Sequence, residues 1–338
     1  MFRTTIFSIA LMFAFPLSST AEPAIKLWPR GTISGQCANH SRAYGVEPMN
    51  QVVFGHKWPH VKGGGIEFID HSVALLNAAA RGRNVAPNMK ARLLAAARGG
   101  AFTKPDWEDA GGSSPTFVSA VIVKTVSFSV AHLRLKGALT AQETKEVQAW
   151  VKKLSTNMKK RANSKDHKAA SIVAQLLWTA AIDDKSGFSK AYKNYSSFLK
   201  ALRSKPFFSD DVRNNNEVMH HLVLGAAVLR MNGIDLTQQK IGKHSFDDAV
   251  AYHAQKVIDN GTNKVKTSGD PKDDARSIFR AEGWGTHLAW IPIYKAVAKS
   301  TPGGAKTREL EKALRRVDGR NFWGIQIGIH SGCMFGRS

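Results

Sequence analysis

The sequence PTFVSAVIVKTVSFSVAHLRLKG occupies residues 115–137 and consists mainly of apolar side chains. Its periodicity predicts a helix over Pro115–Lys136, and we expect Gly137 to end that helix. The next segment, Thr140-Ala141-Gln142-Glu143, has the form of a capping box, in which the first and last side chains satisfy each other's backbone N–H groups. The helix that follows carries an apolar face made of Val147, Trp150, Val151 and Leu154. Together the two segments predict an antiparallel helical hairpin.

The same helical periodicity recurs along the chain, whereas strand alternation is scarce. Further helices are predicted over Ile66–Ala80, Ala169–Ile182, Phe188–Leu202, Glu217–Met231, Phe246–Asp259, His287–Lys299 and Arg308–Val317. Glycine, asparagine or proline separates most of these segments, for example at Asn232-Gly233 and Pro302-Gly303-Gly304. So many successive hairpins predict an all-α fold, an incomplete (α/α) toroid or barrel of antiparallel helical hairpins.

The N-terminus has the pattern of a secretory signal peptide. Arg3 precedes the apolar run Ile6–Pro16, and Ser19-Thr20-Ala21 supplies small residues for cleavage. We therefore expect residues 1–21 to be removed on export, and residues 22–338 to form a single domain in the periplasm or outside the cell. No other segment approaches the roughly 20 uninterrupted apolar residues of a membrane span, so no stable membrane association is expected.

The two cysteines, Cys37 and Cys333, lie near opposite ends of the mature chain. In an oxidising compartment the simplest arrangement is one disulfide between them. The chain-entropy model gives about 4–5 kcal/mol of stabilisation for so long a loop, before any strain is subtracted. The alternative is a pair of free buried thiols.

The formal net charge is +22, from 48 Lys and Arg against 26 Asp and Glu. A field of this size attracts polyanions, and nucleic acid, anionic lipid and acidic polysaccharide all fit it. Export without a nuclease-like motif disfavours nucleic acid, and the lack of a basic amphipathic anchor disfavours lipid. An acidic polysaccharide is thus the expected partner of a protein that we expect to be a monomer.

Two segments gather side chains suited to binding a carboxylate. The first, Arg213-Asn214-Asn215-Asn216-Glu217-Val218-Met219-His220-His221, opens a helical pattern, and the second is Arg276–His287. Amides, imidazoles and guanidinium groups all hydrogen-bond to carboxylates. A more ordinary use of the first segment is a helix N-cap, with Asn216 capping Glu217 onward.

The asparagine run resembles the Asn-Asn-His motif of the family 5 alginate lyases. Arg276-x-x-x-Arg280-Ala281-x-x-Trp284-x-x-His287 is similar to their Arg-Ala-Leu-x-Tyr-His-x-Tyr segment. The resemblance implies an α/α toroid that cleaves a uronate polymer, such as alginate or glucuronan, by β-elimination without an organic cofactor.

The resemblance also implies a role for each matched position. Asn215 falls on the asparagine that neutralises the uronate carboxylate, and Arg280 falls on the family's arginine. Asn216 stands where the family has a histidine, and His287 stands where it has the catalytic tyrosine.

The chemistry of elimination agrees with these side chains. The carboxylate charge must be offset by donors so that the proton beside it can leave, and Asn215, Asn216 and Arg280 are suitable donors. An imidazole can serve as base or acid, so His287 is the first candidate. His220 lies four residues after Asn216 and therefore on the same helical face.

Substrate contacts are expected from aromatic and basic side chains in the loops and near the helix ends. The candidates are Lys57, Trp58, His60, Trp107, Tyr252, Arg276 and Trp284, with Tyr252 also a speculative acid. The alternative for Trp58 and Trp107 is that they plug the ends of hairpins.

Other functions remain open at this point. No nucleotide-binding loop, dinucleotide fingerprint or His-Glu-x-x-His pair occurs, so no cofactor is expected. A zinc site formed by His220-His221 with His244 or His253 would match no standard spacing, so no metal is expected. Acidic pairs keep a glycoside hydrolase possible, namely Asp210-Asp211, Asp247-Asp248 and Asp273-Asp274. A non-catalytic polyanion-binding protein of the periplasm is a third class.

Overall fold

The hairpin predicted around residue 137 is present in the computed structural model. Helix α3 spans Pro115–Leu135, and α4 spans Ala141–Lys160. Gly137 ends α3 with a φ of 60°, a conformation that glycine adopts without strain. The capping box forms as predicted, because Glu143 accepts from the Thr140 N–H at 2.8 Å while the Thr140 hydroxyl accepts from the Glu143 N–H at 3.1 Å.

The structure describes residues 25–28, 64–103, 115–160, 164–261, 288–313, 323–324 and 327–335. The remaining helices in these ranges are α1 Gly64–Ala80, α2 Ala86–Arg98, α5 Lys165–Ala181, α6 Lys185–Leu199, the 3-10 helix η1 Lys200–Arg203, α7 Val212–Met231, α8 Phe246–Gly261, α11 Trp290–Val297, α12 Pro302–Ala313 and α13 Ser331–Met334. Two short strands, β1 Trp323–Gly324 and β2 Ile329–His330, pair antiparallel.

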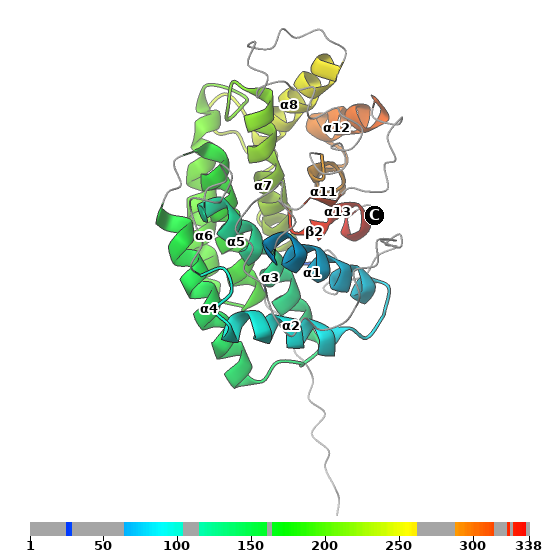
Figure 1. Ribbon diagram of the computed structural model, residues 1–338. Coiled ribbons are helices and arrows are strands. Elements are labelled where there is room, and N and C mark those ends of the chain that lie inside the picture. The colour runs from blue at the N-terminus through cyan, green and yellow to red at the C-terminus, as the bar shows by residue number, and fades with distance from the viewer. Residues whose placement is uncertain are drawn as a thin grey trace, which may run out of the picture.

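The helices form two layers, as an α/α toroid requires. Helices α1, α3, α5, α7 and α11 contact one another in succession and form the inner layer. Helices α2, α4, α6, α8 and α12 pack on the outside, each against a neighbour in its hairpin (Figure 1). Among the described residues, the elements between α11 and α1 are α13, which contacts α11, and β2, which contacts α1 (Figure 1). The predicted incomplete toroid is confirmed.

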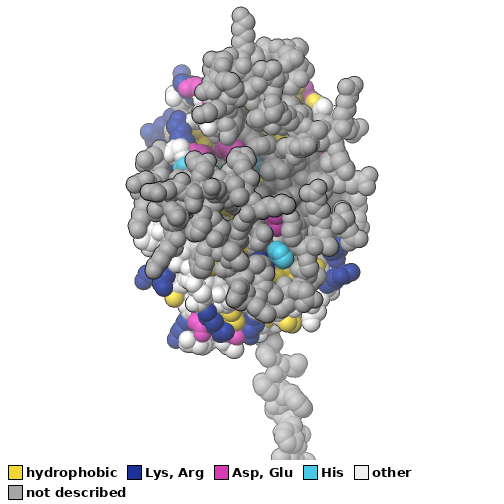
Figure 2. Space-filling view, viewed as in Figure 1, with side chains coloured by type: hydrophobic (Ala, Val, Ile, Leu, Met, Phe, Trp, Pro, Cys, Tyr) yellow, Lys and Arg dark blue, Asp and Glu magenta, His cyan; other side chains and the backbone are white. Residues whose placement is uncertain are grey.

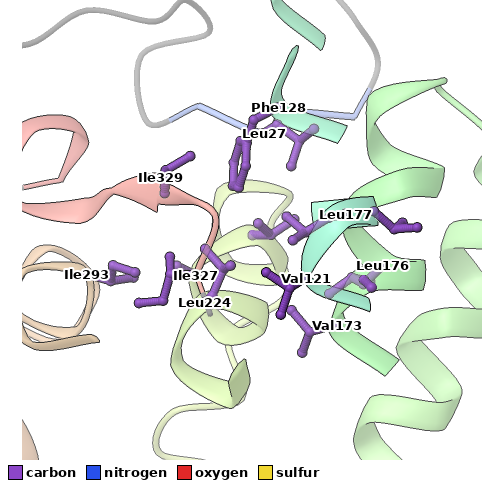
Figure 3. Packing of buried hydrophobic residues seen from close by; sticks show 14 of the residues in the cluster. Leu27, Val121, Phe128, Val173, Leu176, Leu177, Leu224, Ile293, Ile327 and Ile329 are labelled. Carbon is purple, nitrogen blue, oxygen red and sulfur yellow. The ribbon is translucent and has the colours of Figure 1, made fainter. Parts of the chain in front are cut away.

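The core lies between the inner helices. Val121 of α3, Val173 of α5 and Leu224 of α7 are fully buried, and they converge with Ile293 of α11 and Ile327 (Figure 3).

Helix α3 is the most enclosed. Its segment Thr116–Leu135 is long and apolar enough to cross a membrane, but 94% of it is buried inside the protein. Within the described ranges it is the one helix of that length and composition, and its burial marks it as a core helix.

The sequence prediction missed one helix and misplaced the start of another. Helix α2 was not predicted, although Met89, Leu93 and Leu94 form its buried face. Helix α12 begins at Pro302 and not at Arg308, because Pro302-Gly303-Gly304 forms its first turn. These glycines allow close packing. A Cβ on Gly303 would lie 2.5 Å from Asp247 Oδ1 on α8, and one on Gly304 would overlap the Ala298 carbonyl oxygen.

We therefore expect Gly303→Ala to destabilise the protein, although alanine favours helices. Overpacking of a rigid contact costs about 1–3 kcal/mol, which outweighs the gain in helix propensity of about 1 kcal/mol. Urea unfolding followed by circular dichroism measures the difference. Ala305→Gly, at an exposed position of the same helix, controls for propensity and should cost at most about 1 kcal/mol. A Gly303→Ala variant as stable as the wild type would contradict the packing argument.

Candidate functional site

Helix α7 carries the asparagine run inside its first turns. Asp211 is the N-cap residue, and its side chain accepts from the Asn214 N–H at 2.7 Å. The interpretation that Asn216 caps the helix is therefore wrong. Asn214 is exposed, whereas Asn215 is 2% exposed and Asn216 is fully buried.

A hydrogen-bonded chain joins the two buried asparagines through α8. Asn215 Oδ1 accepts from the backbone N–H groups of Phe208 at 2.9 Å and Ser209 at 3.2 Å, which fixes the orientation of its amide. Asn215 Nδ2 therefore donates to His253 Nδ1 at 3.1 Å. Because His253 Nδ1 accepts, the proton of the neutral ring is on Nε2, and Nε2–H donates to Asn216 Oδ1 at 3.0 Å.

Asn216 Oδ1 accepts a second hydrogen bond, from Trp290 Nε1 of α11 at 3.0 Å. These two donors fix the Asn216 amide with its oxygen toward α8 and α11 and its Nδ2 on the opposite side. Nδ2 therefore carries the N–H groups of this side chain on the side away from His253 and Trp290.

His253 is a positioning group and not a proton carrier. Burial, with a smaller effect from His220, lowers its pKa to about 3. Its two nitrogens are both engaged, one by each asparagine. The ring is therefore neutral at physiological pH, and it holds the amides in one arrangement.

His220 lies on the same face as Asn216, as the spacing predicts. Its Nδ1 is 3.0 Å from the Asn216 carbonyl oxygen, an acceptor, so the proton of the neutral ring is on Nδ1. Its Nε2 then carries a lone pair, which makes His220 a group that can accept a proton. The ring is fully buried.

A second polar cluster lies on the α3 and α5 side of α7. Lys124 of α3 is fully buried, and its Nζ is 2.9 Å from His221 Nδ1. Burial lowers the pKa of Lys124 to about 7, although Glu217 opposes the shift. Burial and the Lys124 charge hold the pKa of His221 well below its usual range. Phe117 covers this cluster, with its ring 5.8 Å from His221 and 5.5 Å from His167 of α5.

An aromatic stack lies beside the Asn215 end of the network. The rings of Phe207 and Tyr252 are 5.2 Å apart and inclined by 25°. Lys205 lies 5.1 Å from the Phe207 ring, and Lys256 lies 5.6 Å from the Tyr252 ring. Phe207 precedes Phe208, whose N–H binds Asn215, and Tyr252 precedes His253, so the stack is anchored to the network at both of its rings.

The described acidic pairs have structural roles. Asp211 caps α7, as noted above. Asp247 is buried and accepts from the Tyr294 and Thr301 hydroxyls, both at 2.5 Å, and from the Gly303 N–H at 2.9 Å. Asp248 accepts from the Ser245 N–H and from Lys240. Because these carboxylates are engaged in a helix cap and in hydrogen bonds, we assign them structural roles and not a role in hydrolysis.

Most of the remaining predicted residues lie outside the described part of the chain. These are Lys57, Trp58, His60, Trp107, Arg276, Arg280, Trp284, His287, Asp273, Asp274 and Cys37. Cys333 lies in α13, but its side chain is not described, so the predicted disulfide stays a prediction. Among the residues that are described, no group of three His, Cys, Asp or Glu side chains could hold a metal ion.

Sequence reasoning overlooked three residues of the two clusters. His253 was considered only as a zinc ligand, and Trp290 was taken as part of a helix. Lys124 had a signal that could have been used, since it is the one charged side chain between residues 115 and 131. A charge in the middle of an apolar helix is costly unless it is paired or functional.

The fold is that of the alginate lyases. Alginate lyase A1-III complexed with a tetrasaccharide superimposes with a TM-score of 0.60 over 92% of this chain and 96% of that one, at 15% sequence identity. Alginate lyase A1-III from Sphingomonas species A1 gives a TM-score of 0.57 over 90% and 95% of the two chains, at 14% identity. No protein-family model and no curated protein matches the chain by sequence. At this identity the likeness concerns the fold alone.

Lys124 gives the protein a distinctive stability profile. Its pKa is about 7 in the folded state and near 10.5 when unfolded, so between these values the unfolded state binds more protons and stability rises with pH. We expect the free energy of unfolding to increase from pH 7 to pH 9 by at most about 1.4 kcal/mol per pH unit. Urea titrations of the wild type and Lys124→Met measure this slope.

The Lys124→Met variant should lose most of the slope, because methionine does not titrate. Lys145→Met, which changes an exposed lysine of α4, should keep it. Equal slopes in Lys124→Met and the wild type would show that Lys124 keeps an ordinary pKa.

Proposed function

We propose that the protein is an exported polysaccharide lyase that cleaves a uronate-containing polysaccharide by β-elimination. The fold shared with alginate lyases over nine-tenths of the chain supports the class. The observation that carries the proposal is the pair of buried amides on α7, fixed by His253 and Trp290. They lie on the segment that resembles the carboxylate-binding motif of these lyases.

The two amides have different roles. Asn215 accepts from the N–H groups of Phe208 and Ser209 and donates to His253, so it positions the network. Asn216 holds its oxygen on His253 and Trp290, so Nδ2 is the end from which it would donate to a substrate carboxylate. Arg280, which resembles the family's arginine, would share that charge. Such donors act where negative charge grows in the transition state.

The reaction then needs one proton acceptor and one donor. A neutral imidazole takes the proton at C5, the electron pair forms the C4–C5 double bond, and O4 leaves with a proton returned by an acid. His287 is the candidate that follows from the resemblance, and His220 has the tautomer of a base. Because Asn216 and His220 are fully buried, a polymer reaches them only after a local opening.

The surroundings also suit an acidic sugar. A net charge of +22 attracts a polyanion. The stacked rings of Phe207 and Tyr252 offer apolar surface to a sugar, and Lys205 and Lys256 offer charge to its carboxylates. Removal of residues 1–21 and a Cys37–Cys333 disulfide belong to the same proposal of an exported, monomeric enzyme.

The decisive measurement is the ultraviolet absorbance of an unsaturated product during incubation with alginate, glucuronan and other polyuronates. We expect at least one polymer to give it, and Asn216→Ala to slow its formation about 10²–10³-fold, as for the loss of a transition-state donor. Asn214→Ala changes an exposed amide on the same helix and should leave the rate unchanged. Saturated chain ends would indicate a hydrolase, and no cleavage of any polymer would favour a binding protein.

Two variants of Tyr252 distinguish a stacking role from a role as the acid. As part of the stack, Tyr252→Ala should raise KM several-fold with little change in kcat, because it removes binding that is equal in the ground and transition states. Tyr252→Phe keeps the ring and should behave like the wild type. A large loss of kcat in Tyr252→Phe would instead identify the hydroxyl as the acid.

A further inference from the structure

A separate cavity lies beside the C-terminal end of α3. Its volume is about 700 Å³, within the range of small-molecule sites. The walls come from the end of α1, the first half of α2 and the end of α3, and its polar lining is Arg83, Asn84, Lys90, His132 and Lys136. Lys124, which contacts His221 of the second cluster, and His132 are 132 − 124 = 8 residues apart on α3, which is about 12 Å of helix.

The rim of the cavity is cationic. Arg83 and Lys136 are exposed, and neither forms an ion pair with another described residue. Lys90 is held at 2.8 Å by Glu143, so its charge is partly compensated. Figure 2 shows Lys and Arg side chains along the lower edge of the molecule, where α2 and α4 lie in Figure 1, with hydrophobic side chains and some Asp and Glu among them.

The wall also contains a buried polar side chain. His132 is 3% exposed, and its side chain makes no hydrogen bond with the described residues. Burial, and to a smaller extent Lys136, lowers its pKa to about 4, so the ring is neutral at physiological pH. A neutral imidazole can both donate and accept, which suits a hydroxyl group. The rest of the lining is mainly apolar and includes Pro87, Ala91 and Leu94.

The cationic groups of the lining are accompanied by apolar residues. Arg83 comes from the α1–α2 turn, Lys90 from α2 and Lys136 from the end of α3, and the cavity offers apolar surface as well as charge, whereas a compact anion such as phosphate would use the charge alone. A short acidic sugar chain has carboxylates spaced along it, apolar ring faces and many hydroxyls.

We propose that this cavity is a second carbohydrate site, which binds a short acidic oligosaccharide at a distance from the carboxylate site on α7. The cavity itself establishes the location and the cationic, hydroxyl-binding character. The choice of a uronate chain rests on the proposed function. The site holds the polymer, or a released chain end, on the enzyme.

Calorimetric titration of the full chain with trimannuronate tests the proposal. The Asn216→Ala variant serves as the background, because it weakens binding at the α7 site and slows cleavage. We expect saturable binding to remain in this variant. Adding Arg83→Ala and Lys136→Ala, both at exposed positions, should weaken it about tenfold or more. Adding Lys145→Ala and Lys185→Ala, two exposed lysines away from the cavity, should leave it unchanged.

Maltotriose, a neutral trisaccharide, should not bind. The proposal is overturned if the Asn216→Ala variant binds no trimannuronate, if the Arg83 and Lys136 changes leave the affinity unaltered, or if both double variants weaken binding equally. Displacement of trimannuronate by millimolar inorganic phosphate would also overturn it, because it would indicate a compact-anion site. Failure of the lyase proposal appears separately, as the absence of unsaturated product.

Discussion

The arrangement of the α7 site depends on the neutral state of one buried imidazole. His253 can accept from Asn215 and donate to Asn216 only while it carries a single proton, and burial ensures this by lowering its pKa to about 3. A protonated ring would present two donors and would repel the Asn215 amide hydrogen. The hydrophobic packing of α7, α8 and α11 thus does more than stabilise the fold, because it also sets the protonation that orients the amides.

The α7 site lies on an inner helix of the toroid, where burying polar groups costs free energy. Inner helices of a toroid are buried on most sides, so any polar group on them needs a partner on an adjacent helix. Asn215 and Asn216 find theirs on α8 and α11, and Lys124 finds His221 across the α3–α7 contact. The lowered pKa of Lys124 means that this second pair opposes folding at neutral pH.

Local patterns predicted the helices well and the site only in part. The α3–α4 hairpin followed from Gly137 and the Thr140–Glu143 capping box, because those signals act between neighbours in sequence. Helix α2 and the start of α12 were missed because Pro87, Pro302 and Gly303 resemble breakers unless their packing partners are known. The motif selected Asn215 and Asn216 as candidates, and their role stays a prediction. It could not indicate His253 and Trp290, since they contact Asn216 from 37 and 74 positions away.

The same contacts give a physical reason for the asparagine at position 216. The resemblance to the family 5 lyases places a histidine there, but a neutral imidazole has one lone pair and can accept one hydrogen bond. Two donors, His253 Nε2–H and Trp290 Nε1–H, converge on Asn216 Oδ1 at 3.0 Å each. Only an oxygen with two lone pairs satisfies both, and among neutral side chains an amide does so while still presenting N–H groups to a carboxylate. The asparagine is therefore matched to its partners on α8 and α11, and a histidine at 216 would require those partners to change as well.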